Sequence, residues 1–247
     1  MRYFIDISYD GSNYHGWQIQ NNAKTVQGVL NEALSTILRK DISTIGSGRT
    51  DTGVHAMMQM VHFDCDKQID PLQLVAKLNS LLPLDISVNE IHLVKGEVSA
   101  RFEATSRAYI YKIHQRKNPF KQGLSYHFHQ PLDIGAMNAC CELIKKWKDF
   151  EAMSKVKTEV NNFNCEIFTA SWEKQNDEIH FHVSANRFLR GMVRALVGTM
   201  LDVGQGRMTV EEFQAVLESR DRKKAGRSVP AHGLYLRDII YPKDIYL

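Results

Sequence analysis

The sequence lacks long apolar runs, paired cysteines and low-complexity segments. No stretch reaches the roughly 18 apolar residues of a membrane span, and residues 1–6 alternate where a signal peptide would be continuously apolar. We therefore expect a cytoplasmic protein that has no membrane partner. The four cysteines form no CxxC pair, which indicates neither a disulfide framework nor a zinc site.

Several familiar catalytic motifs are also missing. The chain has no GxxxxGK[ST] phosphate loop, no GxGxxG following a strand, no HExxH and no serine or cysteine nucleophile elbow. His180 and His182 lie two residues apart, which strand alternation explains as well as metal ligation does. We expect neither a cofactor nor a metal.

The composition is that of an ordinary globular protein, with 43% hydrophobic and 24% charged residues among 247. The net charge of +3 hides a strong polarisation along the chain. Residues 101–124 and residues 186–237 each carry a net charge of +5, which leaves −7 for the remainder. Clustered cations of this kind favour a phosphate-binding surface, although solvated basic faces are an open alternative.

Hydrophobic periodicity predicts an α+β protein with two halves, residues 1–105 and 106–247, joined without a flexible linker. Each half should contain a sheet with helices on one face. The predicted strands are 3–9, 42–47, 58–65, 86–94, 104–114, 165–173, 179–186 and a closing strand from 233. The predicted helices are 26–38, 71–82, 133–148, 188–203 and one that starts at Thr209.

The loop Gly48–His55 is the strongest candidate for chemistry. Two glycines bracket Asp51, so the backbone can turn sharply and let another molecule approach. Arg49 would favour the ionised carboxylate that a nucleophile or base requires. The same residues make a good structural turn, which stays open as an alternative. An aspartic protease is disfavoured, because its chemistry needs two aspartates and the chain has a single Asp-Thr-Gly.

The second half contributes basic and aromatic candidates. Arg187, Arg190 and Arg194 are spaced by three and four, which predicts three guanidiniums on one face of a helix. Such a stripe could grip phosphates, or one member could pair with a buried carboxylate, and a solvated face is the alternative. Tyr109 and Tyr111 share a strand face, where they could stack on unpaired bases or pack in the core.

An ordered set of motifs resembles the TruA family of tRNA pseudouridine synthases. The loop Gly48–His55 is similar to the active-site signature of that family. The likeness covers nearly the whole chain and departs from the common pattern at Thr52 and Gly191. The other matching segments are Tyr9-Asp10-Gly11, Tyr14-His15-Gly16-Trp17-Gln18, Leu78-Asn79, Leu82-Pro83, Asp85-Ile86, Ala100-Arg101-Phe102, Arg107-Ala108-Tyr109-Ile110-Tyr111, Met192-Val193-Arg194 and Gly233-Leu234-Tyr235-Leu236.

The resemblance implies a role for each candidate residue. Asp51 would be the catalytic aspartate and Arg49 part of the base-flipping site. Tyr109 would stack on the target base, and Arg194 would pair with the catalytic aspartate. The resemblance also implies two similar α+β halves with the active site in a cleft between them. The remaining residues expected to bind substrate are Arg107, Arg187, Arg190, Gly48, His55 and Leu234.

The resemblance further implies the reaction and the partners. Members of the family work as homodimers without cofactor or metal, and isomerise uridines at positions 38, 39 and 40 on the 3′ side of the tRNA anticodon arm. The expected function is therefore uridine isomerisation in tRNA with an essential aspartate. The alternative from another class is a non-catalytic RNA-binding module with sheets like those of RNA-recognition motifs.

Overall fold

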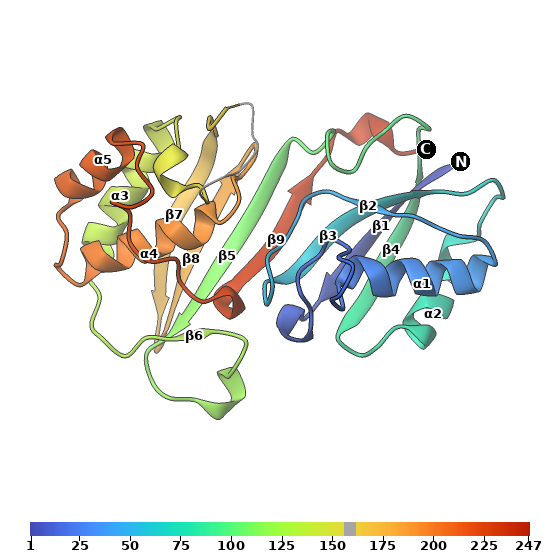
Figure 1. Ribbon diagram of the computed structural model, residues 1–247, viewed down its shortest axis with the longest axis horizontal. Coiled ribbons are helices and arrows are strands. Elements are labelled where there is room, and N and C mark those ends of the chain that lie inside the picture. The colour runs from blue at the N-terminus through green and yellow to red at the C-terminus, as the bar shows by residue number, and fades with distance from the viewer. Residues whose placement is uncertain (156–161) are drawn as a thin grey trace. The chain divides into compact units, whose positions relative to one another are not determined.

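The chain forms two compact units, each of which contains both strands and helices. The computed structural model describes residues 1–155 and 162–247. Unit 1 comprises Met1–Thr105 and Tyr235–Leu247, and unit 2 comprises Ser106–Leu234. Figure 1 shows helices and strands in both units, which confirms the predicted α+β class. In the described part of the chain, no helix is long and apolar enough to cross a membrane.

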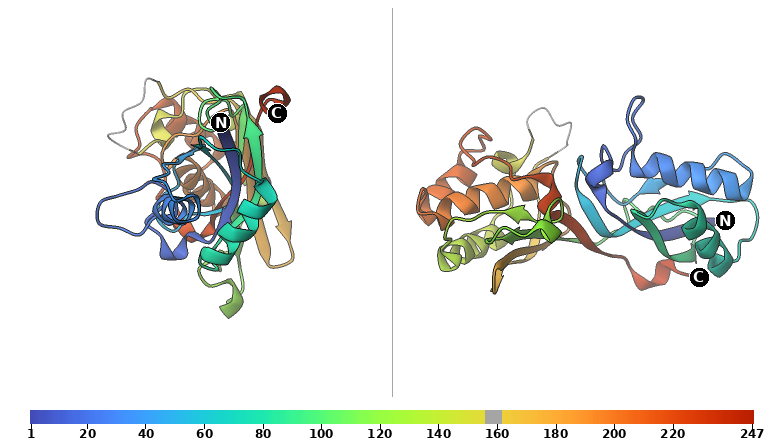
Figure 2. Two further views of the ribbon diagram at one scale, coloured as in Figure 1. Left: turned by 90° about the vertical axis from the view of Figure 1, so that its right-hand side faces the viewer. Right: turned by 90° about the horizontal axis from the view of Figure 1, so that it is seen from below.

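Unit 1 contains a mixed sheet in the order β4-β1-β3-β9, with the short strand β2 also paired to β3. Strand β1 runs antiparallel to both β3 and β4, whereas β9 joins β3 in parallel. The helices α1 and α2 lie beside the strands of this unit (Figure 2). The elements are β1 (Arg2–Tyr9), α1 (Val26–Leu38), β2 (Ile45–Gly46), β3 (His55–Asp64), α2 (Pro71–Leu81), β4 (Ile86–Val94) and β9 (Leu234–Ile240).

Local sequence explains where the helices of unit 1 begin. The Thr25 hydroxyl accepts a hydrogen bond from the Gly28 amide and caps α1. Asp70 caps α2 through two backbone amides, and Pro71 occupies its first turn, where a missing N–H costs nothing. Both starts confirm the sequence prediction. The alternating residues Tyr3, Ile5, Ile7 and Tyr9 of β1 are buried in the core.

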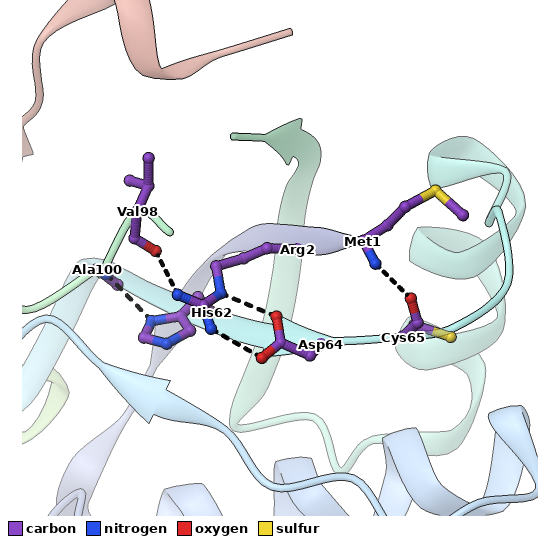
Figure 3. Close-up of polar contacts among 7 residues, drawn as sticks. All are labelled: Met1, Arg2, His62, Asp64, Cys65, Val98 and Ala100. Atoms are coloured by element: carbon purple, nitrogen blue, oxygen red, sulfur yellow. Dashed lines mark hydrogen bonds and ion pairs between the residues drawn. The ribbon is translucent and has the colours of Figure 1, made fainter. Parts of the chain in front are cut away.

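A polar network joins the segment after β4 to the start of β1 and the end of β3 (Figure 3). The Arg2 guanidinium donates to the Asp64 carboxylate at 2.8 Å and to the Val98 carbonyl at 3.0 Å. The Nδ1 atom of His62 accepts a hydrogen bond from the Ala100 amide at 3.1 Å. Burial and the charge of Arg2 lower the pKa of His62 to about 4, so the imidazole is neutral and can accept that bond.

Unit 2 contains an antiparallel sheet of β5, β8 and β7, with β6 added in parallel at the end of β5. Helix α3 packs on β7 and also contacts α4 and α5. Thr209 and Glu212 form the predicted capping box of α5. The elements are β5 (Ser106–His114), β6 (Tyr126–His127), α3 (Ile134–Lys146), β7 (Ile167–Gln175), β8 (Glu178–Ala185), α4 (Met192–Gly204) and α5 (Val210–Glu218).

The last thirteen residues belong to a different unit from the one that the sequence predicts, which is a second half of residues 106–247. Tyr235–Leu247 belongs to unit 1, because β9 pairs with β3 and the tail continues along the sheet. The Lys95 amide donates to the Ile245 carbonyl, and the Leu247 amide donates to the Leu93 carbonyl, both at 3.1 Å. Linear order alone does not indicate which earlier strand a final strand will join.

Candidate active site

The loop that carries Asp51 is a tight turn between β2 and β3. Its Val54 amide donates to the Asp51 carbonyl at 3.1 Å, and Gly53 adopts a φ of +76°, which favours glycine. Asp51 is half-buried, whereas its neighbours Arg49 and Thr52 are exposed. The turn therefore carries a carboxylate at the protein surface on a constrained backbone.

The segment 11–17 holds this turn through backbone contacts. The Trp17 amide donates to the Thr50 carbonyl at 3.2 Å, and the Gly53 amide donates to the Tyr14 carbonyl at 3.4 Å. Gly16 has a φ of +82°, and a Cβ there would lie 2.3 Å from the Thr50 carbonyl oxygen. Only glycine allows this approach, so the Tyr14-to-Trp17 motif positions the Asp51 turn.

Side chains reinforce the same contact. The Tyr9 hydroxyl lies 2.8 Å from the Thr50 hydroxyl in a buried hydrogen bond, and the Tyr9 ring stacks on Trp17. At the base of the segment, the Tyr14 hydroxyl donates to the Asp85 carboxylate at 2.5 Å. Burial and the Asp85 carboxylate raise the pKa of Tyr14 above its usual value, which keeps the hydroxyl protonated as the donor.

His55 is a positioning residue in this structure. Its side chain is only 1% exposed, and its Nδ1 atom accepts a hydrogen bond from the Gly11 amide at 3.1 Å. Its ring stacks on Tyr235 with 4.5 Å between the centroids. These contacts leave no exposed ring surface for a substrate. The position of Gly48 is fixed by a hydrogen bond that its carbonyl accepts from the Gln59 side chain at 3.0 Å.

In unit 2, Tyr109 and Tyr111 share a strand face as predicted but have different environments. Tyr111 is fully buried and donates to the Pro230 carbonyl at 2.8 Å, so its role is core packing. Tyr109 stays half-buried and meets Phe188 edge to face, with ring centroids 5.1 Å apart. Arg107 donates to the carbonyl of Asn186, the residue that follows β8, at 2.9 Å.

The prediction of three arginines on one helix face is wrong. Helix α4 begins at Met192, after Gly191 in a left-handed conformation with a φ of +74°. Arg187 and Arg190 therefore lie in the preceding loop, and Arg194 alone is helical. The Arg194 Nε donates to the Val229 carbonyl at 2.7 Å, and the Arg194 carbonyl accepts from the Val229 amide at 3.2 Å.

The sequence did not assign roles to several residues that position the site. Gly16, Tyr14 and Asp85 were noted as motif residues, yet their function depends on contacts with distant segments. Leu234 opens β9 and is buried. Among the described residues, no group of histidine, cysteine or acidic side chains could hold a metal ion.

Comparison with known proteins identifies the family. A family model described as tRNA pseudouridine synthase matches residues 6–103 and again residues 147–242, as two similar halves would. A tRNA pseudouridine synthase A from Parabacteroides distasonis is 47% identical, over 99% of this chain and 98% of that protein. Proteins of the same name are 47% identical in Bacteroides thetaiotaomicron (99% of this chain, 92% of that one) and 43% identical in Porphyromonas gingivalis (100% and 99%). The chain therefore belongs to the tRNA pseudouridine synthase family, whose members are isomerases that act on tRNA.

Proposed function

We propose that this enzyme converts uridine to pseudouridine in the anticodon stem-loop of tRNA, with Asp51 as its essential carboxylate. The observation that carries this assignment is the placement of Asp51 on a surface turn held by Gly16, Trp17 and Tyr9. A carboxylate in a preorganised turn can act on a substrate without a large rearrangement of the backbone. Family membership favours this reading over a non-catalytic RNA-binding module.

The chemistry requires the base to leave the RNA stack. The N1–C1′ bond breaks, the uracil turns, and a C5–C1′ bond forms, while C5 loses its proton to solvent and N1 takes one up. Extrusion of the base costs a few kcal/mol, which contacts in the protein must offset. The half-buried ring of Tyr109 is the proposed stacking surface for the flipped uracil, and Arg49 belongs to the base-flipping site.

Arg194 is the proposed cationic partner of the catalytic carboxylate. A guanidinium has five N–H donors, and the Nε donor is used on the Val229 carbonyl. This bond fixes the direction of the planar group, as bidentate recognition of a carboxylate requires. The loop arginines Arg187 and Arg190, together with Arg107, are the proposed contacts to the RNA backbone.

The test uses tRNA that carries tritium at uracil C5, because isomerisation releases this label to solvent. We expect the wild type to release tritium, and Asp51→Asn to bind tRNA normally with no release. Asp41→Asn is the matched control, since it makes the same chemical change at an exposed position. Wild-type protein that binds tRNA and releases nothing would contradict the proposed reaction. Full turnover by Asp51→Asn would contradict the role of Asp51.

The finer assignments have their own tests. Replacing the uridines on the 3′ side of the anticodon arm by cytidine should abolish tritium release, whereas replacements elsewhere in the tRNA should not. We also propose that the enzyme is a homodimer, which light scattering of the eluting protein measures directly. Because tRNA is the substrate, the proposal places the enzyme in the cytoplasm.

A further inference from the structure

A groove of about 680 Å³ lies in unit 2, and none of the residues proposed above for catalysis or substrate binding lines it. Its walls come from the second half of α4, the segment 224–230 and the chain around β6. The volume falls within the range of about 300–1,000 Å³ that is usual for ligand sites. The residues that give it chemical character are Tyr126, Phe128, Arg207, Lys224 and Arg227.

The wall formed by residues 224–230 packs closely against α4. A Cβ at Gly198 would lie 1.8 Å from the Arg227 carbonyl oxygen, so the loop crosses the helix where only glycine fits. The Gly226 amide donates to the Thr199 hydroxyl at 3.0 Å. These contacts fix the backbone of the wall before any ligand arrives.

Arg222 clamps the same segment from within. Its guanidinium donates to the carbonyls of Ala225 and Gly226 at 3.3 and 3.0 Å, and to the Ser228 hydroxyl at 2.9 Å. Arg222 thus braces the segment internally, whereas Lys224 and Arg227 line the groove. The wall is a built structure rather than a loose surface loop.

The groove has a positive charge that nearby acids do not compensate. Lys224 and Arg227 are exposed, and neither forms an ion pair or a side-chain hydrogen bond in the described part of the chain. Arg207 differs, because it pairs with Asp202. Two uncompensated cations on a fixed backbone are suited to a phosphate group.

The lining also contains aromatic side chains. Tyr126 and Phe128 are half-buried, with ring centroids 5.6 Å apart and planes inclined by 54°. Aromatic side chains beside a basic groove bind single-stranded nucleic acid by stacking on the bases while cations hold the backbone. The groove therefore combines the two elements that recognise one nucleotide, a cationic side and a stacking side.

We propose that this groove binds a nucleotide of the tRNA other than the uridine that is isomerised. Its phosphate lies by Lys224 and Arg227, and its base lies against Tyr126 or Phe128. The proposal rests on the proposed function, since it takes tRNA as the substrate. Through Val229, which exchanges two hydrogen bonds with Arg194, the wall of this groove is continuous with a proposed active-site residue.

The first test measures how tRNA affinity depends on salt. Each phosphate contact contributes about 0.7–0.9 to the slope of log affinity against log salt. The double variant Lys224→Ala, Arg227→Ala removes both cations from the one phosphate that they hold, so it should lower the slope by about 0.7–0.9 and weaken binding. The matched control is Lys146→Ala, Lys174→Ala, which removes two exposed lysines of the same unit outside the groove. Equal slopes for the double variant and wild type would overturn the proposal, and so would equal losses in variant and control.

The second test places a crosslinker in the groove. The four native cysteines are buried, and burial raises the pKa of Cys140 and Cys141 to about 12, so an introduced thiol can be labelled selectively. We expect Lys224→Cys carrying an aryl azide to crosslink to tRNA on illumination, and Lys146→Cys to give little product. Equal crosslinking of both variants would contradict the site.

Competition identifies the source of the phosphate. We expect tRNA to protect Lys224→Cys from labelling, and inorganic phosphate or uridine 5′-monophosphate to fail at the same concentration. Equal protection by the small molecules would show a free phosphate site and overturn the assignment to RNA. The two proposals fail separately. Tritium release with an unchanged salt slope contradicts the groove alone, whereas a groove-dependent slope without tritium release contradicts the isomerase alone.

Discussion

Gly16→Ala would test whether close packing of segment 11–17 positions the Asp51 turn. The new methyl group would lie 2.3 Å from the Thr50 carbonyl oxygen, in a residue whose φ is +82°. A left-handed alanine costs about 1–2 kcal/mol, and overpacking costs about 1–3 kcal/mol more. We therefore expect the free energy of unfolding to fall by about 2–5 kcal/mol.

Gly206→Ala is the matched control for the cost of placing alanine in a left-handed backbone conformation. Gly206 has a similar φ of +70°, and a Cβ there would meet nothing within 4 Å. This variant should lose only the left-handed cost of about 1–2 kcal/mol. Urea unfolding of both variants then isolates the steric contribution at Gly16 by difference.

Catalysis provides the second readout for Gly16→Ala. The folded variant should bind tRNA and release tritium more slowly in a single turnover. A displacement of about 1 Å at a catalytic group can reduce the rate by about a hundredfold. Equal destabilisation of Gly16→Ala and Gly206→Ala would refute the packing argument. A normal single-turnover rate in a destabilised Gly16→Ala would refute the positioning role.

Three further predictions concern stability and are measured by urea unfolding. Burial raises the pKa of Asp6 to about 6, so wild-type stability should fall as the pH rises from about 4 through 6. Asp6→Asn should be up to about 3 kcal/mol more stable than wild type above pH 7, and no more stable than wild type below pH 4. If the stability difference between Asp6→Asn and wild type did not depend on pH, the raised pKa of Asp6 would be refuted. Burial lowers the pKa of His62 to about 4, so wild-type stability should fall as the pH drops from about 6.5 through 4, and His62→Gln should lack this component of up to about 3 kcal/mol. A wild-type pH dependence retained in His62→Gln would contradict it. Thr209→Ala should cost about 1 kcal/mol through the lost cap of α5 without slowing tritium release, and an unchanged free energy of unfolding would show that the cap is dispensable.

Sequence predicted the elements whose ends depend on local chemistry. Helices α1, α2 and α5 begin where Thr25, Asp70 and Thr209 cap them, because a cap acts within three residues. The start of α4 was predicted four residues early, since the apolar period continues through a loop that ends in a left-handed Gly191. The two-residue strand β6 has no sequence signal, because its pairing with β5 depends on the fold.

In the candidate site, too, sequence predicts the local features and misses the long-range contacts. Two glycines around a carboxylate indicate that the Asp51 loop is a candidate for chemistry. The contacts that hold it join residues far apart, such as Tyr9 with Thr50 and Tyr14 with Asp85, and periodicity contains no information on them. The sequence leaves open whether Tyr109 and Tyr111 stack on bases or pack in the core. Their burial differs in the structure, because Tyr111 is in the core and Tyr109 is only half-buried.

The return of the chain to unit 1 has a consequence for folding during synthesis. Strand β9 pairs with β3, and the Tyr241 hydroxyl donates to the Ala100 carbonyl, so unit 1 is completed by residues translated after all of unit 2. Residues 106–234 are continuous and can fold as soon as they leave the ribosome. The N-terminal residues, although made first, leave His55 and Ala56 at the start of β3 without the partner strand β9 until the final segment arrives, and this exposed stretch is where a nascent chain would aggregate.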